Sequence, residues 1–351
     1  MLWVDTHRPS SLDELTYHDA ISDRLRSLAK SGELPHMLFY GPPGAGKRTR
    51  VNALLTAIYG KGVQKVKWET RTIVVGKSKK KVQVLSLGSK HHVEINPSQS
   101  GNNDRHVVQE VVKEIARYRP LNASDHPFKV VVMTEVDSLS KDAQHGLRRT
   151  MEKYSSSCRI IMICENFNKL VAPLHSRCLA IRVPAPKTET VFKVLNDVCK
   201  AEGAALPERL ANRIVEHSQR NLRRALLTLE ACKVAKFPFA PDQPIVVPDW
   251  QRFLANLALE ITREQSPQKL QNCRAQLYEL LANCIPPEII LAFLARELSK
   301  KVDTQLKVKI AEHAAYYEHR MRMGQKPIFH LEAFIAKFMA LYKRYLVDLF
   351  A

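Results

Sequence analysis

The sequence predicts an α/β nucleotide-binding domain that is followed by two helical regions. Three observations lead to this fold class. Residues 41–49 form a glycine-rich loop of the phosphate-binding kind, apolar strands alternate with helical patterns before residue 183, and helical periodicity dominates the remainder. Alternating strands and helices are typical of a parallel sheet with helices packed on its faces.

The elements of the first half can be placed from their apolar patterns. A short buried strand at 34–40 runs directly into the loop, and a helix at 50–59 follows it, which is the context that such a loop requires. Two more strands are expected at 129–133 and 159–164, with helices at 104–118 and 141–154.

Residues 62–93 interrupt this alternation. Two apolar runs, 72–75 and 82–85, are expected to pair as a hairpin across a turn at 76–81. Between residues 61 and 90 a single acidic residue, Glu69, opposes a series of basic ones. We interpret the segment as a basic insertion that carries Lys61, Lys65, Lys67, Arg71, Lys77, Lys79, Lys80, Lys81 and Lys90.

Proline clusters divide the chain into three expected domains. Pro184 and Pro186 end the α/β region, so the first domain is 1–183 and a helical domain of 184–237 follows it. Four prolines between 238 and 248 indicate a linker that opens a second helical domain, 238–351. An apolar stripe in that domain is either ordinary core or a face that packs on other subunits: Leu331, Phe334, Ile335, Phe338, Leu341, Tyr342 and Tyr345.

Composition restricts the class of partner and the compartment. The 54 Lys and Arg against 35 Asp and Glu give a net charge of +19, which fits either a nucleic-acid partner or a solvated basic surface. No apolar run is long enough to span a membrane, and the N-terminus resembles no targeting peptide, so we expect an intracellular protein without a membrane partner. The seven cysteines form no Cys-x-x-Cys pair, which argues against zinc and disulfides.

The loop at 41–49 contains the groups that bind phosphate. Gly41 and Gly46 let backbone N–H groups approach the phosphates, and Lys47 adds a positive charge at the β and γ oxygens. Arg48, however, occupies the position of the hydroxyl that normally holds Mg²⁺, and Thr49 follows one place late. Mg²⁺ is therefore possible only through Thr49.

The strand that should supply the metal carboxylate also departs from the usual pattern. Such a strand ends in Asp for the metal and Glu to activate water, whereas here Thr134 stands in the metal position and only Glu135 remains. With Arg48, this makes two displaced metal-organising residues. We therefore expect weak or absent hydrolysis at this site.

Four motifs occur in a specific order along the whole chain and resemble a known family. They are similar to those of the small subunits of eukaryotic replication factor C, the sliding-clamp loader of the AAA+ class. Three features indicate which subunit of that family the chain resembles, namely the one at one end of a five-subunit spiral. They are a basic residue after Lys47, Thr-Glu-Val-Asp at 134–137, and the basic insertion. The four motifs are Trp3-Val4-Asp5 with Arg8-Pro9, the loop 41–49, the run 143–154, and Ser176-Arg177-Cys178.

The resemblance implies a fold, cofactors and partners. The fold is an AAA+ α/β domain followed by a helical lid, 184–237, and an all-α collar, 238–351, that joins the subunits. ATP or ADP is the implied cofactor. The implied partners are the other four subunits, a PCNA-type ring that is the sliding clamp, and primer–template DNA, in replication and repair in the nucleus.

The resemblance also implies roles for individual residues. Arg177 is an arginine finger that reaches into the ATP site of a neighbouring subunit, and Arg223 is the second-sensor arginine on the lid. Arg224, the next residue along the helix, points about 100° away, so we expect it to be structural. Glu165 stands in the first-sensor position, where Asn166 is an alternative one residue later. The nucleotide contacts comprise Val4, Arg8, Pro9, Thr16, Gly41, Pro42, Pro43, Gly44, Ala45, Gly46, Lys47, Arg48, Thr49 and Arg223.

DNA contact is expected at the N-terminal end of the helix near 102–105, with Lys79–Lys81 and the pair Arg148 and Arg149 as weaker candidates. Two other functions remain open. One is a self-sufficient AAA+ DNA-dependent ATPase, against which Arg48, Thr134 and Glu165 argue. The other is a nucleotide-independent scaffold subunit, against which the intact loop argues.

Overall fold

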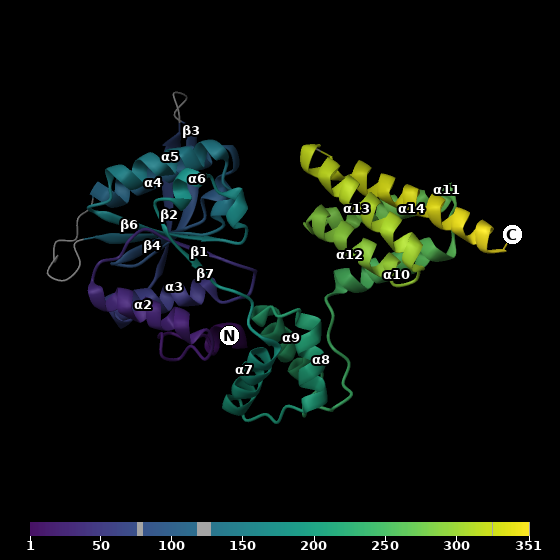
Figure 1. Ribbon diagram of the computed structural model, residues 1–351, viewed down its shortest axis with the longest axis horizontal. Coiled ribbons are helices and arrows are strands. Elements are labelled where there is room, and N and C mark those ends of the chain that lie inside the picture. Colours follow the sequence, from purple (N-terminus) through teal and green to yellow (C-terminus); the bar gives the residue numbers. More distant parts are fainter. Residues whose placement is uncertain (76–79, 118–127, 325, 351) are drawn as a thin grey trace. The chain divides into compact units, whose positions relative to one another are not determined.

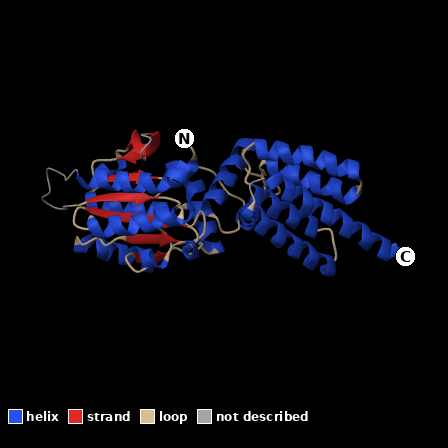
Figure 2. Ribbon diagram, turned by 90° about the horizontal axis from the view of Figure 1, so that it is seen from above, coloured by secondary structure: helices blue, strands red, loops and turns tan. Residues whose placement is uncertain are grey.

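The computed structural model describes residues 1–75, 80–117, 128–324 and 326–350. The chain divides into two compact units, Met1–Val246 and Val247–Ala351 (Figure 1). The first unit combines a sheet with helices, and the second is built of helices, as Figure 2 shows by its colours. Within the described residues, no helix has the length and apolarity that a membrane span requires.

The first unit is centred on a seven-stranded sheet of order β2-β3-β4-β5-β6-β1-β7. Strands β4, β5, β6, β1 and β7 are mutually parallel, whereas β2 and β3 are antiparallel to their neighbours. The strands predicted at 34–40, 129–133 and 159–164 are β1, β5 and β6. The strands are β1 Met37–Tyr40, β2 Lys67–Val75, β3 Lys80–Gly88, β4 His92–Ile95, β5 Lys129–Met133, β6 Cys158–Cys164 and β7 Leu179–Arg182.

The predicted hairpin of the basic segment exists, but it is part of the sheet. Its two strands are nine residues each, longer than the pairs 72–75 and 82–85, and Ile73 pairs with Val82. Strand β3 also pairs with β4, for example Ser86 with Ile95, so the hairpin extends the sheet at one edge. The predicted turn includes residues 76–79, which lie outside the described part of the chain.

Helices cover both faces of the parallel strands, so the strands are apolar on both sides. Val131 and Met133 face α4 and α5, whereas Val130 and Val132 face α2 and α3. Figure 1 shows these two helix pairs on opposite sides of the sheet. The helices are α2 Asp19–Ser31, α3 Lys47–Tyr59, α4 Asp104–Arg117 and α5 Lys141–Lys153.

Three helices after the sheet form a lid with its own core. This core also takes in Trp3 of the short helix α1, Trp3–Thr6, which is 7 % exposed. The proline-rich segment that follows forms neither helix nor strand, but it packs on the lid, because Gln243 Nε2 donates to Cys232 O at 2.7 Å. The lid helices are α7 Thr188–Ala201, α8 Glu208–Ser218 and α9 Leu222–Ala235.

The second unit is a helical bundle whose core contains the predicted apolar stripe. Leu331, Phe334, Ile335 and Phe338 are buried, and the rest of the stripe is half-buried against them. Of the two interpretations, ordinary core describes the buried residues. The division into domains at 183/184 and 237/238 stays a prediction. The helices are α10 Asp249–Arg263, α11 Pro267–Ala282, α12 Pro287–Ser299, α13 Thr304–Met323 and α14 Pro327–Phe350.

All seven cysteines are free, and five of them are buried. Burial and the nearby Asp137 raise the pKa of the Cys164 thiol to about 12. Among the described residues no group of three or more His, Cys, Asp and Glu side chains is placed to hold a metal. The five buried cysteines pack as small apolar side chains.

Candidate nucleotide-binding site

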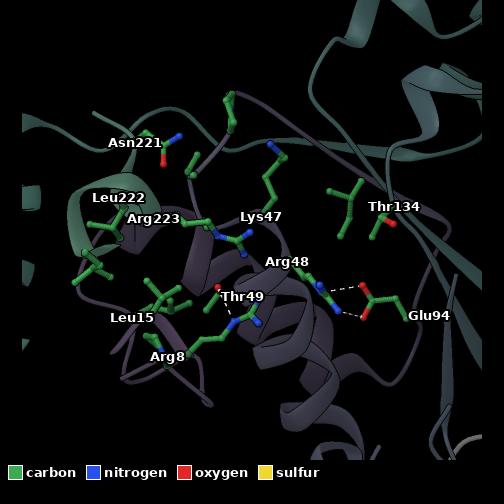
Figure 3. A pocket seen from close by; sticks show the side chains of 18 of the residues that line it. Arg8, Leu15, Lys47, Arg48, Thr49, Glu94, Thr134, Asn221, Leu222 and Arg223 are labelled. Atoms are coloured by element: carbon green, nitrogen blue, oxygen red, sulfur yellow. Dashed lines mark hydrogen bonds and ion pairs between the residues drawn. The ribbon is translucent and has the colours of Figure 1, made fainter. Parts of the chain in front are cut away.

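The predicted loop opens onto a cavity of about 710 Å³, large enough for a nucleotide. The cavity lies where the carboxyl ends of the strands, the start of α3 and the start of α9 meet. Figure 3 shows Lys47, Arg48 and Arg223 among the side chains that line it. It brings together most of the predicted contacts, namely Val4, Arg8, Pro9, Thr16, Pro43, Gly44, Ala45, Gly46, Lys47, Arg48, Thr49, Arg223, Thr134, Glu135 and Glu165.

All three glycines of the loop have backbone conformations that other residues rarely adopt. Gly41 has φ +147°, Gly44 has φ +70° and Gly46 has φ +86°, and Gly46 is the N-cap residue directly before α3. A Cβ at Gly46 would lie 2.3 Å from the hydroxyl of Tyr17, which donates to Ala45 O at 3.2 Å. These contacts fix the conformation of the loop. Its N–H groups and the N-terminal end of α3 can therefore stabilise the same bound anion.

Lys47 is held over the loop by two carbonyl groups. Its Nζ donates to Gly41 O at 2.7 Å and to Pro42 O at 2.9 Å. Burial lowers the pKa of Lys47, and the nearby charge of Glu165 opposes that shift. Gly41 and Pro42, which do not themselves border the cavity, therefore contribute by positioning the ammonium group.

Arg50, which belongs to none of the predicted motifs, contacts the loop from the first turns of α3. Its side chain is fully buried, Nη2 donates to Tyr17 O at 2.7 Å, and its guanidinium lies 4.4 Å from the centre of the Tyr17 ring. Nη1 reaches Ala45 O at 3.4 Å. The sequence offered one signal, a basic residue at the start of the helix predicted at 50–59.

Arg8 and Thr49 form the side of the cavity next to the N-terminal segment. Arg8 Nε donates to Thr49 Oγ1 at 3.2 Å. Burial lowers the pKa of Arg8, and the charges of Arg48 and Arg223 lower it further. The Thr49 hydroxyl, the predicted Mg²⁺ ligand, therefore already accepts a hydrogen bond from Arg8. In Figure 3, Thr49 and Thr134 lie on opposite sides of Lys47.

The predicted degenerate hydrolytic positions lie at the strand edge of the cavity. The hydroxyl of Thr134 donates to Ile95 O at 3.4 Å. Glu135, at φ 55°, accepts from Asn96 Nδ2 at 3.0 Å and from Ser98 Oγ at 3.2 Å. The carboxylate that would activate water is therefore bonded to the segment after β4.

Arg48 forms an ion pair that no motif predicted. Its Nη2 donates to Glu94 Oε2 at 2.8 Å, and its Nε lies 2.8 Å from Glu94 Oε1. Both contacts are drawn in Figure 3. Glu94 belongs to β4, and its side chain is only 9 % exposed. The ion pair therefore joins the first turn of α3 to the sheet at the edge of the cavity.

The lid closes the cavity through the first turn of α9. Leu222 N donates to Gly44 O at 3.3 Å, and Asn221 caps the helix by accepting from Arg224 N at 3.1 Å. Arg223 borders the cavity, whereas the side chain of Arg224 contacts His217. The roles expected for the two arginines stay predictions.

The predicted arginine finger does not border its own chain's cavity. Arg177 follows the short helix α6, Ala172–His175, and its side chain is 31 % exposed. Its Nε donates to Glu152 Oε1 at 2.6 Å, and Nη1 donates to Pro173 O at 2.9 Å. Glu152 also lies 3.6 Å from Arg148 Nε, and its pKa is lowered chiefly by the hydrogen bond from Arg177.

The predicted DNA contacts receive little support from side-chain geometry. The N-terminal end of α4 carries Asp104, a buried carboxylate that accepts from the backbone N–H groups of Arg105 and Ser140 at 2.6 and 2.7 Å. It supplies a negative charge where phosphate was expected. Lys79 lies outside the described residues, and the side chains of Asn102, Lys80 and Lys81 are likewise not described.

The fold and the cavity together define a nucleotide-binding protein of the AAA+ class, with a loop, a parallel sheet and a helical lid. The Holliday junction branch migration motor RuvB of Thermotoga maritima has a similar fold, with a TM-score of 0.51 over 77 % of this chain and 85 % of that chain. At 16 % identity this similarity concerns the fold alone.

The chain belongs to the replication factor C subunit family. It is 52 % identical to "Replication factor C subunit 3" of Mus musculus over 99 % of this chain and 98 % of that protein. It is 44 % identical to "Replication factor C subunit 5" of Schizosaccharomyces pombe over 97 % of both. This confirms the resemblance to the small subunits of replication factor C, here to those named subunit 3 in mammals and subunit 5 in Schizosaccharomyces pombe.

Family models match three consecutive parts of the chain. Residues 250–346 match the C-terminal domain of replication factor C subunit 3, and 193–234 match the AAA+ ATPase lid domain of the RCF1/5-like group. Residues 17–187 match the delta subunit of DNA polymerase III. The predicted fold class is therefore confirmed, from the AAA+ domain through the lid to the helical C-terminal region.

Proposed function

We propose that this chain is the end subunit of a replication factor C clamp loader, where it binds nucleotide, hydrolyses little of it, and completes a neighbour's ATP site with Arg177. One observation carries the proposal. The groups that bind phosphate border one cavity, whereas Arg48 stands at the sequence position of the metal-binding hydroxyl and is paired with Glu94.

Nucleotide binding is supported by charge and shape. Lys47, Arg8 and Arg223 line one cavity with the loop, and three cations around a polyphosphate give charge-assisted hydrogen bonds. ATP or ADP is the proposed ligand. The proposed adenine side is the wall of Val4, Arg8, Pro9 and Thr16.

Weak hydrolysis is supported by three side chains at the strand edge. Thr134 has no carboxylate for a metal, and Glu135 is bonded to Asn96 and Ser98. Glu165 borders the cavity where a polar neutral side chain would assist the γ-phosphate. A carboxylate there would repel that phosphate.

A role for Arg177 in a neighbouring site is supported by its fixed and half-exposed position. Bonds to Glu152 and Pro173 orient the guanidinium, which lowers the entropy lost when it meets a phosphate. An arginine that stabilises the charge of the transferring phosphoryl group accelerates the step by about 10³–10⁵.

The proposed partners are the other four subunits, a PCNA-type ring and primer–template DNA in the nucleus. In this mechanism the collar joins the subunits, and ATP in the partner sites tightens the spiral and opens the ring for DNA. Hydrolysis in the site completed by Arg177 then helps to release the closed clamp. The proposal covers replication and repair alike.

The test uses the reconstituted five-subunit complex. We expect Arg177→Ala to remove one neighbour's share of the ATPase that DNA and clamp stimulate, and Lys47→Ala to leave the rate nearly unchanged. Arg26→Ala serves as the control, because Arg26 makes ion pairs with Asp13 and Asp23 outside the cavity. An unchanged ATPase in the Arg177→Ala complex would refute the role in trans.

The two alternatives have outcomes of their own. Brisk ATP turnover by the isolated chain, abolished by Lys47→Ala, would identify a self-sufficient ATPase. Failure of labelled ADP and ATP to bind at any concentration would identify a nucleotide-independent scaffold.

A further inference from the structure

We propose that Arg48 supplies the positive charge that phosphate-binding loops ordinarily take from Mg²⁺, so that this site binds a nucleotide polyphosphate free of metal. The inference rests on the proposed function only in that loop 41–49 binds a nucleotide. It assigns to the site a ligand class, a metal-free nucleoside di- or triphosphate, and to Arg48 and Glu94 the role of a built-in counter-cation and its anchor.

The residues present do not fit a magnesium ion. Mg²⁺ requires oxygen ligands in near-octahedral geometry, ordinarily a loop hydroxyl and a strand carboxylate beside the phosphates. Arg48 replaces the hydroxyl, and Thr49 accepts a hydrogen bond from Arg8. Thr134 replaces the carboxylate and bonds to a backbone carbonyl, so neither usual ligand is available.

Two of the carboxylates that border the cavity, Glu94 and Glu135, are bonded to other side chains. Both oxygens of Glu94 lie 2.8 Å from nitrogens of Arg48. Glu135 accepts from Asn96 and Ser98. Glu165 is exposed and lies near enough to Lys47 to affect its pKa. Three or more carboxylate, His or Cys ligands do not come together anywhere in the part of the chain that the structure describes.

The geometry of Arg48 suits the substitute role. A guanidinium is planar, keeps its charge at every accessible pH, and cannot ligate a metal. Two of its nitrogens face Glu94, which leaves Nη1 for a phosphate oxygen. The Arg48 side chain is 42 % exposed and borders the cavity, whereas its anchor Glu94 is nearly buried.

The charges nearest the sequence position of the missing hydroxyl favour the same conclusion. The cavity is bordered by four cations, Arg8, Lys47, Arg48 and Arg223, and by five carboxylates, Glu14, Glu94, Glu135, Glu165 and Asp197. Of these carboxylates Glu94 is already paired with Arg48. A metal ion beside Arg48 would be repelled by a guanidinium that cannot lose its proton, whereas a phosphate oxygen would be attracted.

The experiment measures binding of fluorescently labelled ADP to the full chain, in excess Mg²⁺ and in EDTA. For the natural sequence we expect the two dissociation constants to agree within roughly threefold. For Arg48→Thr we expect binding in EDTA to weaken by about 10- to 100-fold, the range of a hydrogen bond to a charged group. Mg²⁺ should restore part of that affinity, because the substitution introduces a hydroxyl and frees the carboxylate of Glu94.

A second readout counts metal directly. The chain is saturated with ADP and Mg²⁺, freed of unbound ligand by gel filtration, and measured for magnesium and nucleotide. We expect close to no Mg²⁺ per bound ADP for the natural sequence. Arg26→Thr is the matched control, since it removes a guanidinium with a carboxylate partner outside the cavity and should leave both readouts unchanged.

The outcomes are distinguishable. Loss of affinity by tenfold or more when Mg²⁺ is removed from the natural chain would overturn the inference, and so would one Mg²⁺ retained per nucleotide, while the proposed nucleotide binding would stand. Absence of ADP binding in both buffers would overturn the proposed function and the inference with it. If Arg48→Thr does not fold, the two measurements on the natural chain still decide.

Discussion

Replacement of Gly44 by alanine should disrupt the contact between the loop and the start of the lid helix α9. Gly44 has φ +70°, and a Cβ there would lie 1.9 Å from Asn221 Oδ1. Gly32, at the end of α2, has the same φ of +70° and nothing within 4 Å of such a Cβ. The two substitutions therefore share the backbone strain and differ in the collision.

The sizes of the two effects follow from these contacts. The left-handed backbone costs about 1–2 kcal/mol for alanine in either variant. In Gly44→Ala the contact must also lengthen by about 1.5 Å to reach ordinary separation. Either the Asn221 cap breaks, at a cost of about 1 kcal/mol, or the lid moves and carries Arg223 away. Loss of one charged contact would weaken ADP binding by about 10- to 100-fold.

The assay is ADP titration of the full chain by fluorescence, with urea unfolding as the measure of stability. We expect Gly32→Ala to lose stability but to bind ADP normally, and Gly44→Ala to lose both. Adding Asn221→Ala removes the colliding amide, so the double variant should regain affinity relative to Gly44→Ala. Equal ADP affinity for Gly44→Ala and Gly32→Ala would refute the reasoning.

Two further predictions concern stability. Burial, with the neighbouring His91, lowers the pKa of His92 to about 4. As the pH falls, His92 is therefore protonated in the unfolded chain at a higher pH than in the folded chain. The free energy of unfolding should fall by about 3 kcal/mol between pH 6.5 and pH 4. Urea titrations should show a shallower fall for His92→Asn, and an identical pH profile would contradict the assignment. Phe334→Ala should cost about 3–5 kcal/mol, because that side chain is buried in the second unit. On the same helix Phe329→Ala, at a half-exposed position, should cost far less in thermal unfolding, and similar costs would show that burial does not govern the effect.

The sequence predicted those features that depend on local patterns. The strand before the loop, the loop itself and the helix after it are contiguous, so glycine spacing and an apolar run were sufficient to place them. The strands at 129–133 and 159–164 are buried on both faces, which gives continuous apolar runs that are easy to recognise. The hairpin was predicted too short, because its exposed face alternates polar residues with Trp68 and Leu85 and gives a weak pattern.

The features that were missed depend on residues far apart in the chain. Glu94 and Arg48 are 46 residues apart and meet only because β4 ends beside the start of α3. Arg50 is buried because Tyr17 and Ala45 offer carbonyl groups to it. Asn221 collides with any side chain at Gly44 only once the lid is folded. No spacing rule within a motif contains such pairings. Lys47, Arg48 and Arg223, by contrast, could be predicted from motifs as residues of one site, and they do border one cavity.

The contact of α1 with the lid has a consequence for the order in which the protein folds during synthesis. Trp3 N donates to Glu230 Oε2 at 3.0 Å, and the Trp3 ring lies 4.4 Å from Lys233 Nζ, so residues 227 positions apart hold one another. At ordinary rates of about 5–20 residues per second, ribosomes need roughly 10–50 s to make that stretch. During this interval α1 has no lid on which to pack. A ribosome-bound chain should therefore bind its nucleotide only after α9 has emerged. Nucleotide binding would then indicate that the α/β domain and the lid have both been made.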